Sequence, residues 1–170
     1  TLRLQGKKKE LAEKEALLAK VEDMHEMNPM LGLRGVRLSI VFPQIVEMQT
    51  AAIIGAACEC AKRKIKAEVE IMIPLIGHVN ELKVIKTQLE SVAKATMKKH
   101  GVKVHYSFGT MIEVPRAALT ADEIAAETSF FSFGTNDLTQ MTYAISRDDS
   151  GKFIRKYVED KIIPGDPTES

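Results

Sequence analysis

Tryptophan is missing from this sequence, cysteine occurs only twice, and aromatic residues make up 5% of the 170 positions. Neither sign of charge is in excess, because 24 lysines and arginines stand against 23 aspartates and glutamates, for a formal net charge of +1. The broad basic surface on which nucleic-acid binding depends is therefore not expected. Apolar runs are too short and too interrupted to cross a bilayer. We expect neither nucleic acid nor a membrane among the partners.

The amino-terminal segment carries lysines and glutamates where a secretory signal needs an apolar core. We therefore expect a protein of the cytoplasm or of an organelle lumen that is not secreted. The two cysteines, Cys58 and Cys60, stand two positions apart in a predicted helix, where side chains point about 200° away from each other. This spacing disfavours a mutual disulfide or one shared metal ion, and we predict buried free thiols.

Strand and helix patterns alternate through most of the chain. Apolar periodicity predicts strands over residues 69–76, 104–108 and 130–133, and helices over 7–27, 43–64, 80–100, 117–127, 138–145 and 153–163. Strand-to-strand intervals of about 27 to 34 residues are typical of βα units, whose right-handed crossovers make a sheet parallel. Three or four strands cannot close a barrel of eight. The fold is therefore either a small open α/β sheet or part of a larger α/β structure.

Local signals predict where several of these helices begin and end. Pro43 suits a first helical turn. Asn80 is expected to cap the next helix and Gly101 to close it. Thr120-x-x-Glu123 matches a capping box for the helix over 117–127. The face of the 43–64 helix that we expect to pack on the sheet consists of Ile45, Gln49, Ala52, Ile53, Ala56 and Cys60.

A phenylalanine-rich run ends abruptly in a polar loop. Three phenylalanines within residues 130–133 favour a buried strand that is covered on both faces. Gly134 then allows the backbone to approach a ligand closely. Thr135, Asn136 and Asp137 offer a hydroxyl, an amide and a carboxylate at adjacent positions. This stretch therefore predicts a site loop at the carboxyl end of a strand.

A second stretch has the same form, because residues 104–113 run from a strand-like segment through Gly-Thr to Glu113. If the two strands are neighbours, about 4.8 Å apart, Glu113 and Asp137 reach one ion together. Magnesium takes one or two carboxylates plus substrate oxygens. The alternative, that each carboxylate only caps the helix that follows, stays open at this point.

Arg34 stands between Gly32 and Gly35. Glycines on both sides clear space for a guanidinium to meet a phosphate or a carboxylate in a fork geometry. A solvated arginine in a turn is the alternative.

Four blocks in order resemble the phosphoenolpyruvate-binding domain of the pyruvate, phosphate dikinase family of phosphoenolpyruvate-utilising enzymes. The resemblance extends from about Met24 to Phe153. Phosphoenolpyruvate synthase and enzyme I of the sugar phosphotransferase system share the Gly-Thr-Asn-Asp-Leu-Thr-Gln block. The four blocks are residues 28–38, 70–75, 109–121 and 130–140.

The resemblance implies a fold and a reaction. The fold would be α/β, part of a (β/α)8 TIM-type barrel with parallel strands, in which residues 1–27 are a helical lead-in and 28–170 a partial barrel domain. The reaction would convert ATP, pyruvate and phosphate to AMP, phosphoenolpyruvate and diphosphate through a phosphohistidine. Glu113 and Asp137 match the family's Mg²⁺ ligands. Arg34, Gly134, Thr135 and Asn136, together with those two carboxylates, match its contacts to pyruvate and phosphoenolpyruvate.

Two parts of the family's machinery are not found in this sequence. The acid/base cysteine of a Cys-Gly-Glu-His-Gly-Gly block is absent, and no histidine stands in a phosphohistidine motif. We therefore expect a fragment that is inactive alone and whose parent enzyme, by resemblance a homodimer, supplies the phosphohistidine domain. The alternatives are phosphoenolpyruvate synthase or phosphotransferase-system enzyme I, a magnesium-dependent keto-acid lyase of the citrate-lyase type, and a binding or assembly module without activity.

Overall fold

The computed structural model describes residues 8–26 and 28–169. Contacts divide the chain into two units, one that runs to Leu33 and one that begins at Arg34. In the first unit, α1 (Lys8–Asp23) has no buried residue, as the exposed amphipathic pattern predicts. It ends before the predicted position 27, and residue 27 itself lies outside the described residues.

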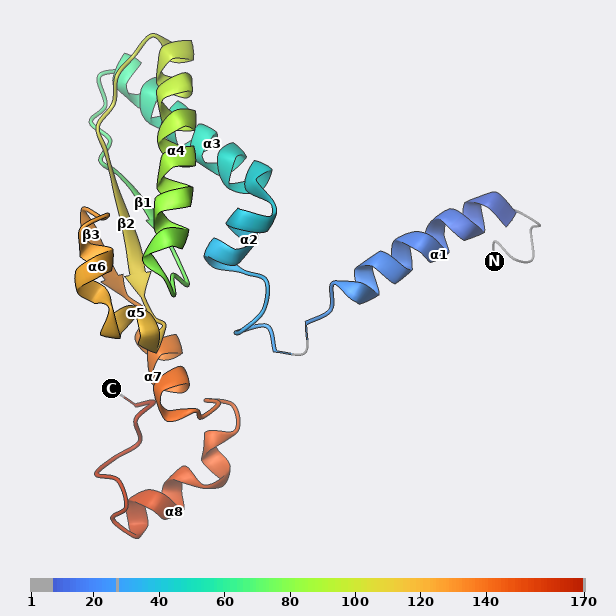
Figure 1. The fold of residues 1–170 in the computed structure, drawn as a ribbon, viewed down its shortest axis with the longest axis vertical. Helices are drawn as coiled ribbons and strands as arrows, with labels where there is room; N and C mark the ends of the chain where they lie inside the picture. Colours follow the sequence, from blue (N-terminus) through green and yellow to red (C-terminus); the bar gives the residue numbers. More distant parts are fainter. Residues whose placement is uncertain (1–7, 27, 170) are drawn as a thin grey trace. The chain divides into compact units, whose positions relative to one another are not determined.

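A three-stranded parallel sheet in the order β1-β2-β3 forms the centre of the second unit. Its strands are β1 (Val69–Ile73), β2 (Tyr106–Ile112) and β3 (Phe130–Phe133). The prediction of parallel strands is thus confirmed. Because the strands are parallel, their carboxyl ends lie at one rim, where the ribbons continue into the next helices (Figure 1).

Helices α2 (Gly35–Val41), α3 (Pro43–Lys62) and α4 (Val79–His100) pack together beside this sheet (Figure 1). Burial of Ile54, Ile71, Leu82, Ile85 and Leu89 makes one apolar core between the helices and the strands. Such a core is the main favourable contribution to the stability of the second unit.

The ends of α4 are set by its own sequence. Gly101 closes the helix in the left-handed region at φ 67°, as predicted. The cap, however, is His78 and not Asn80, because the His78 ring accepts the Asn80 N–H while the Glu81 carboxylate accepts the His78 N–H. Two of the open amide groups at the start of the helix are satisfied in this way.

Pro43 begins α3 as predicted, but the predicted buried face of this helix is wrong. The buried side chains are Val46, Thr50, Ile54, Ala57 and Cys58. The helix packs mainly on α4, which rotates the buried stripe away from the expected residues. Both thiols are free as predicted, although Cys60 is only partly buried.

The predicted helix over 117–127 is split at Thr120 into α5 (Pro115–Leu119) and α6 (Ala121–Ala125). No capping box forms, because the Thr120 hydroxyl donates to the carbonyl of Arg116 instead. After β3 come α7 (Thr135–Tyr143), the 3₁₀ turn η1 (Ser150–Lys152) and α8 (Ile154–Glu159).

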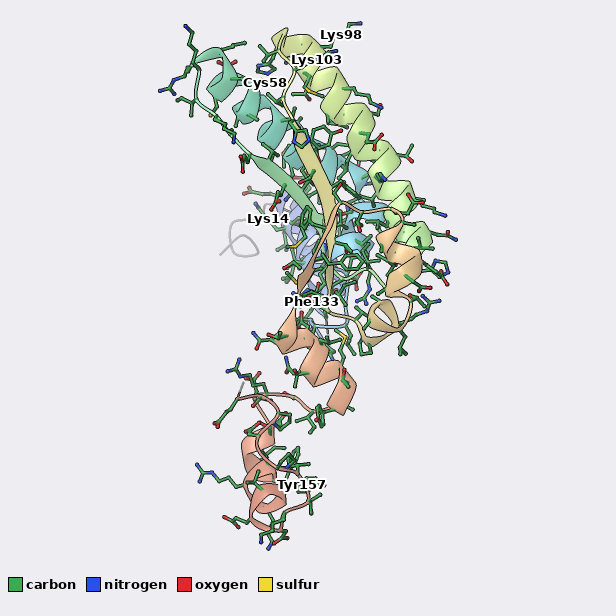
Figure 2. All side chains as sticks on the ribbon, turned by 90° about the vertical axis from the view of Figure 1, so that its left-hand side faces the viewer. Lys14, Cys58, Lys98, Lys103, Phe133 and Tyr157 are labelled. Atoms are coloured by element: carbon green, nitrogen blue, oxygen red, sulfur yellow. The ribbon has the colours of Figure 1, made fainter. Side chains whose placement is uncertain are left out.

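The expectation that β3 is covered on both faces is wrong for this chain. All four of its residues are at least partly exposed, and Phe133, at the junction with α7, is 64% exposed (Figure 2). The reason is that β3 is an edge strand, paired only with β2.

Among the described residues, no single helix is long and apolar enough to cross a membrane; α2 and α3 reach that length and composition only as a pair bent by 108°.

Candidate functional site

Two carboxylates meet where β2 and β3 end. Glu113 follows β2 directly, and Asp137 lies in the first turn of α7, just after β3. The parallel register carries both to the same rim of the sheet. Sequence pattern and strand pairing therefore agree on the placement of these two residues.

Glu113 is a buried acid, with 5% of its surface exposed. Its Oε1 accepts the backbone N–H of Leu75, from the end of β1, at 2.7 Å. Burial raises the pKa of Glu113, the Leu75 N–H lowers it, and the charge and hydrogen bond of Asp137 raise it again. The two carboxyl groups are thus close enough for their like charges to repel when both are ionised.

Gly134 makes room for this pair. A β-carbon at position 134 would lie 2.6 Å from both the Cβ and the Oε2 of Glu113, and 2.9 Å from the sulfur of Met111. The need for glycine is one of space, since Gly134 has an ordinary φ of −86°. The side chain of Glu113 is the group that closely approaches the backbone at position 134. This contact packs the start of α7 against Glu113.

Arg34 lies directly before α2, and a backbone hydrogen bond attaches the first turn of α2 to the end of β1. It is the exposed N-cap residue of α2, and the N–H of Val36 donates to the carbonyl of Pro74 at 3.0 Å. Gly35 has φ +55°, and a β-carbon there would lie 2.9 Å from the same carbonyl. The positive charge of Arg34 lowers the pKa of Glu113, a smaller effect than that of Asp137. Arg34 and Glu113 therefore belong to one electrostatic cluster.

Thr135 and Asn136 are exposed in the first turn of α7. The Asn136 Oδ1 accepts a hydrogen bond from the guanidinium of Arg147 at 3.2 Å, and the Arg147 N–H donates to the Gln140 Oε1 at 2.9 Å. With its oxygen engaged, Asn136 keeps its NH₂ group for another acceptor. We assigned no role to Arg147 from the sequence; its only signal was its place within the part of the chain, from about Met24 to Phe153, that resembles the family.

Leu75 is a second residue that the sequence analysis missed. It is 2% exposed and has φ +61°, a region that a bulky side chain occupies at a cost of about 1–3 kcal/mol. A leucine after a proline gives no signal of such a conformation.

The donor set at the rim suits a small hard cation. The described part of the chain holds no group of three or more histidines, cysteines, aspartates or glutamates that could bind a metal. Magnesium, however, needs only one or two protein carboxylates and takes its other ligands from substrate and water. Glu113 and Asp137 meet that requirement, and a divalent cation would relieve their repulsion.

A pair of carboxylates and an arginine thus lie at the carboxyl rim of a parallel sheet, where α/β proteins place their ligand sites. Sequence comparison specifies the family. The profile described as "PEP-utilising enzyme, PEP-binding domain" matches residues 4–164, so this chain belongs to the family of phosphoenolpyruvate-utilising enzymes. The family resemblance inferred from the four sequence blocks is confirmed.

Its curated relatives include several named pyruvate, phosphate dikinase. The protein of Entamoeba histolytica is 54% identical over 99% of this chain, that of Giardia intestinalis 53% identical over 87%, and that of Clostridium symbiosum 53% identical over 88%. The matched regions cover 19%, 17% and 17% of those proteins. The chain thus spans less than a fifth of the length of these relatives.

Proposed function

We propose that this chain is the pyruvate- and phosphoenolpyruvate-binding segment of a pyruvate, phosphate dikinase. The observation that carries the proposal is the placement of Glu113, directly after β2, and of Asp137, in the first turn of α7, at one rim of the parallel sheet. The names of the relatives support the same reading. The proposed reaction of the parent enzyme is the phosphohistidine-mediated conversion of ATP, pyruvate and phosphate to AMP, phosphoenolpyruvate and diphosphate.

In this proposal Glu113 and Asp137 hold Mg²⁺, which, when bound, polarises oxygens of the substrate. The chain's own residues contribute the rest. Arg34 offers a planar pair of donors to the phosphoryl group and neutralises its charge. Asn136 donates its free NH₂ to a substrate oxygen, because Arg147 holds its Oδ1. Gly134 and Thr135 form the turn that positions this amide.

We further propose that residues 28–170 are part of a (β/α)8 barrel, with residues 1–27 as a helical lead-in. Among the described strands, β1 and β3 each have one unpaired edge, which a barrel does not leave open. A groove of about 480 Å³ runs along β1 and is lined by Ile45, Ile53 and Met72, among others. These apolar side chains, with Phe133 on the other edge, are partly exposed in this chain and suit further strands and helices.

The remaining catalytic groups would come from the rest of the parent enzyme. No residue of this chain is assigned the acid/base or the phosphohistidine role, so we propose that it does not turn over substrate by itself. On the resemblance alone, we also propose a homodimeric parent; the expected location in the cytoplasm or an organelle lumen stays a prediction.

The test is isotope exchange between pyruvate and phosphoenolpyruvate in the full-length protein that carries this chain. Exchange should require the phosphohistidine and should be lost in Asp137→Asn, while Asp122→Asn, an exposed aspartate of α6, should keep it. Keto-acid cleavage without any phosphohistidine, or exchange that survives Asp137→Asn, would overturn the proposal.

A further inference from the structure

The turn at the end of β1 makes contacts on two sides of the candidate site. On one side, the Leu75 N–H donates to the Glu113 Oε1 at 2.7 Å. On the other, the carbonyl of Pro74 accepts the N–H of Val36, in the first turn of the helix that follows Arg34, at 3.0 Å. The two polar atoms of the single Pro74–Leu75 peptide group therefore fix the element after Arg34 and the carboxylate of Glu113.

This double contact depends on the backbone conformation of Leu75. In a continuing strand, the Leu75 N–H would lie in the plane of the sheet and serve the ladder. Here it reaches a buried carboxylate instead, and φ +61° at Leu75 turns the chain out of the strand direction directly after this peptide group. Proline at position 74 has no N–H of its own to satisfy at this point.

The side chain of Leu75 holds the turn in place. It is 2% exposed, and its Cβ and Cδ1 lie 3.1 and 3.2 Å from where a β-carbon of Gly35 would be. Ile73, the last residue of β1 before the Pro74–Leu75 turn, is fixed as well, because its carbonyl accepts a hydrogen bond from the buried hydroxyl of Thr110 at 2.7 Å. Packing on one side and a hydrogen bond on the other thus support a conformation that leucine seldom adopts.

We propose that the Pro74–Leu75 turn is a positioning element of this site, with Leu75 as its positioning residue. The turn donates a hydrogen bond to the Oε1 of Glu113. The Oε2, which lies beside Gly134 at the start of α7, is then the oxygen left for a cation. The turn also sets the start of α2, and with it the place of Arg34. Glu113 then acts through a single oxygen. The inference rests on the proposed function for its ligand, Mg²⁺, and on the structure alone for its geometry.

Three variants of the full-length protein separate positioning from packing. Leu75→Ala keeps the penalty of a positive φ but loses the side chain that holds the turn. Leu75→Gly loses more packing but adopts φ +61° freely and keeps the N–H. Leu89→Ala, at a residue of α4 that is 1% exposed, makes a comparable cavity in the core and serves as the control.

The first readout is the dissociation constant for Mg²⁺, measured where all variants are folded. We expect Leu75→Ala to weaken binding about tenfold, Leu75→Gly by less than about threefold, and Leu89→Ala by less than about twofold. A purely structural role predicts the reverse order of alanine and glycine, because glycine leaves the larger void. Equal effects of Leu75→Ala and Leu89→Ala, or weaker binding in Leu75→Gly than in Leu75→Ala, would overturn the inference.

The second readout needs no metal. Hydrogen–deuterium exchange of the peptide that contains Val36 should speed up in Leu75→Ala and remain slow in Leu75→Gly and Leu89→Ala, because the Val36 N–H depends on Pro74. Unchanged exchange in Leu75→Ala contradicts the inference. If the unmodified protein binds no Mg²⁺, the proposed function fails, whereas the exchange measurement still decides the role of the turn.

Discussion

Gly134 and Glu113 are in contact so close that a β-carbon at position 134 would lie 2.6 Å from the Cβ of Glu113. Glu113 is buried, and its Oε1 accepts a hydrogen bond from the backbone N–H of Leu75. The side chain of Glu113 therefore has little freedom to move aside. The strand-to-helix junction that carries Asp137 is therefore fitted to the carboxylate of the neighbouring strand.

The substitution Gly134→Ala should force these elements apart and cost about 1–3 kcal/mol of unfolding free energy, as overpacking in a filled interior does. It should also weaken Mg²⁺ binding, because Asp137 moves with α7. The control is Gly151→Ala, where an added β-carbon meets nothing within 4 Å. Thermal melting of both variants checks the prediction; equal melting temperatures would show that the contact is not restrictive.

Glu113→Gln should change how stability depends on pH. The pKa of Glu113 is raised in the folded protein, chiefly by burial, so the folded state holds this proton more tightly than the unfolded state does. Its contribution is present below the usual carboxyl range and is lost as pH rises through the raised pKa. Without metal, the wild-type protein should therefore become less stable relative to Glu113→Gln as pH rises toward neutrality.

Adding Mg²⁺ at neutral pH should restore the stability of the wild type and leave Glu113→Gln almost unchanged, since binding to the folded state stabilises it. Melting curves across pH, with and without Mg²⁺, give the comparison. Glu123→Gln, at an exposed position of α6, is the control. A wild-type protein that gains stability relative to Glu113→Gln as pH rises would contradict the assigned cause of the shift.

Arg34→Lys keeps the charge but loses the planar fork of donors. In the full-length protein, the transfer of the phosphoryl group to pyruvate should slow about tenfold or more, as expected when one charge-stabilising contact is lost. The ATP half-reaction should keep its rate. Arg155→Lys, at an exposed position of α8, should alter neither. An equal loss in both half-reactions would indicate misfolding rather than a role for Arg34.

Arg147→Ala should release the Oδ1 of Asn136, whereas the Gln140 side chain keeps its hydrogen bond to the backbone N–H of residue 147. Because Asn136 can then rotate, we expect a KM for pyruvate about threefold to tenfold higher, as loss of one hydrogen bond to a positioned group would give. Affinity for Mg²⁺ should stay the same. Steady-state kinetics beside a metal titration separate the two effects, and a change in metal affinity with an unaltered KM would disagree with this assignment.

The sequence predicted the features that depend on periodicity. Repeated strand-then-helix units required a parallel sheet, and a parallel sheet brings Glu113 and Asp137 to one rim. Gly101 was predicted to close α4 because few other residues adopt its positive φ without cost.

Features that depend on tertiary contacts were not predicted. His78 caps α4 in place of Asn80 through a ring nitrogen, a role that histidine seldom has in capping rules. The buried face of α3 is set by α4, a helix distant in sequence. Leu75 adopts a positive φ where its side chain packs beside Gly35 and its N–H donates to Glu113. Local propensity contains none of this information.

Glu113 and Asp137 are proposed to form the metal site of a pyruvate-binding segment. The most direct test is to titrate the full-length protein with Mn²⁺, as a probe for Mg²⁺, in the presence of pyruvate and without nucleotide, and to follow bound metal by electron paramagnetic resonance. We predict one site that is lost in both Glu113→Gln and Asp137→Asn and retained in Asp122→Asn. Mn²⁺ binding of wild-type affinity in both site variants would contradict the account.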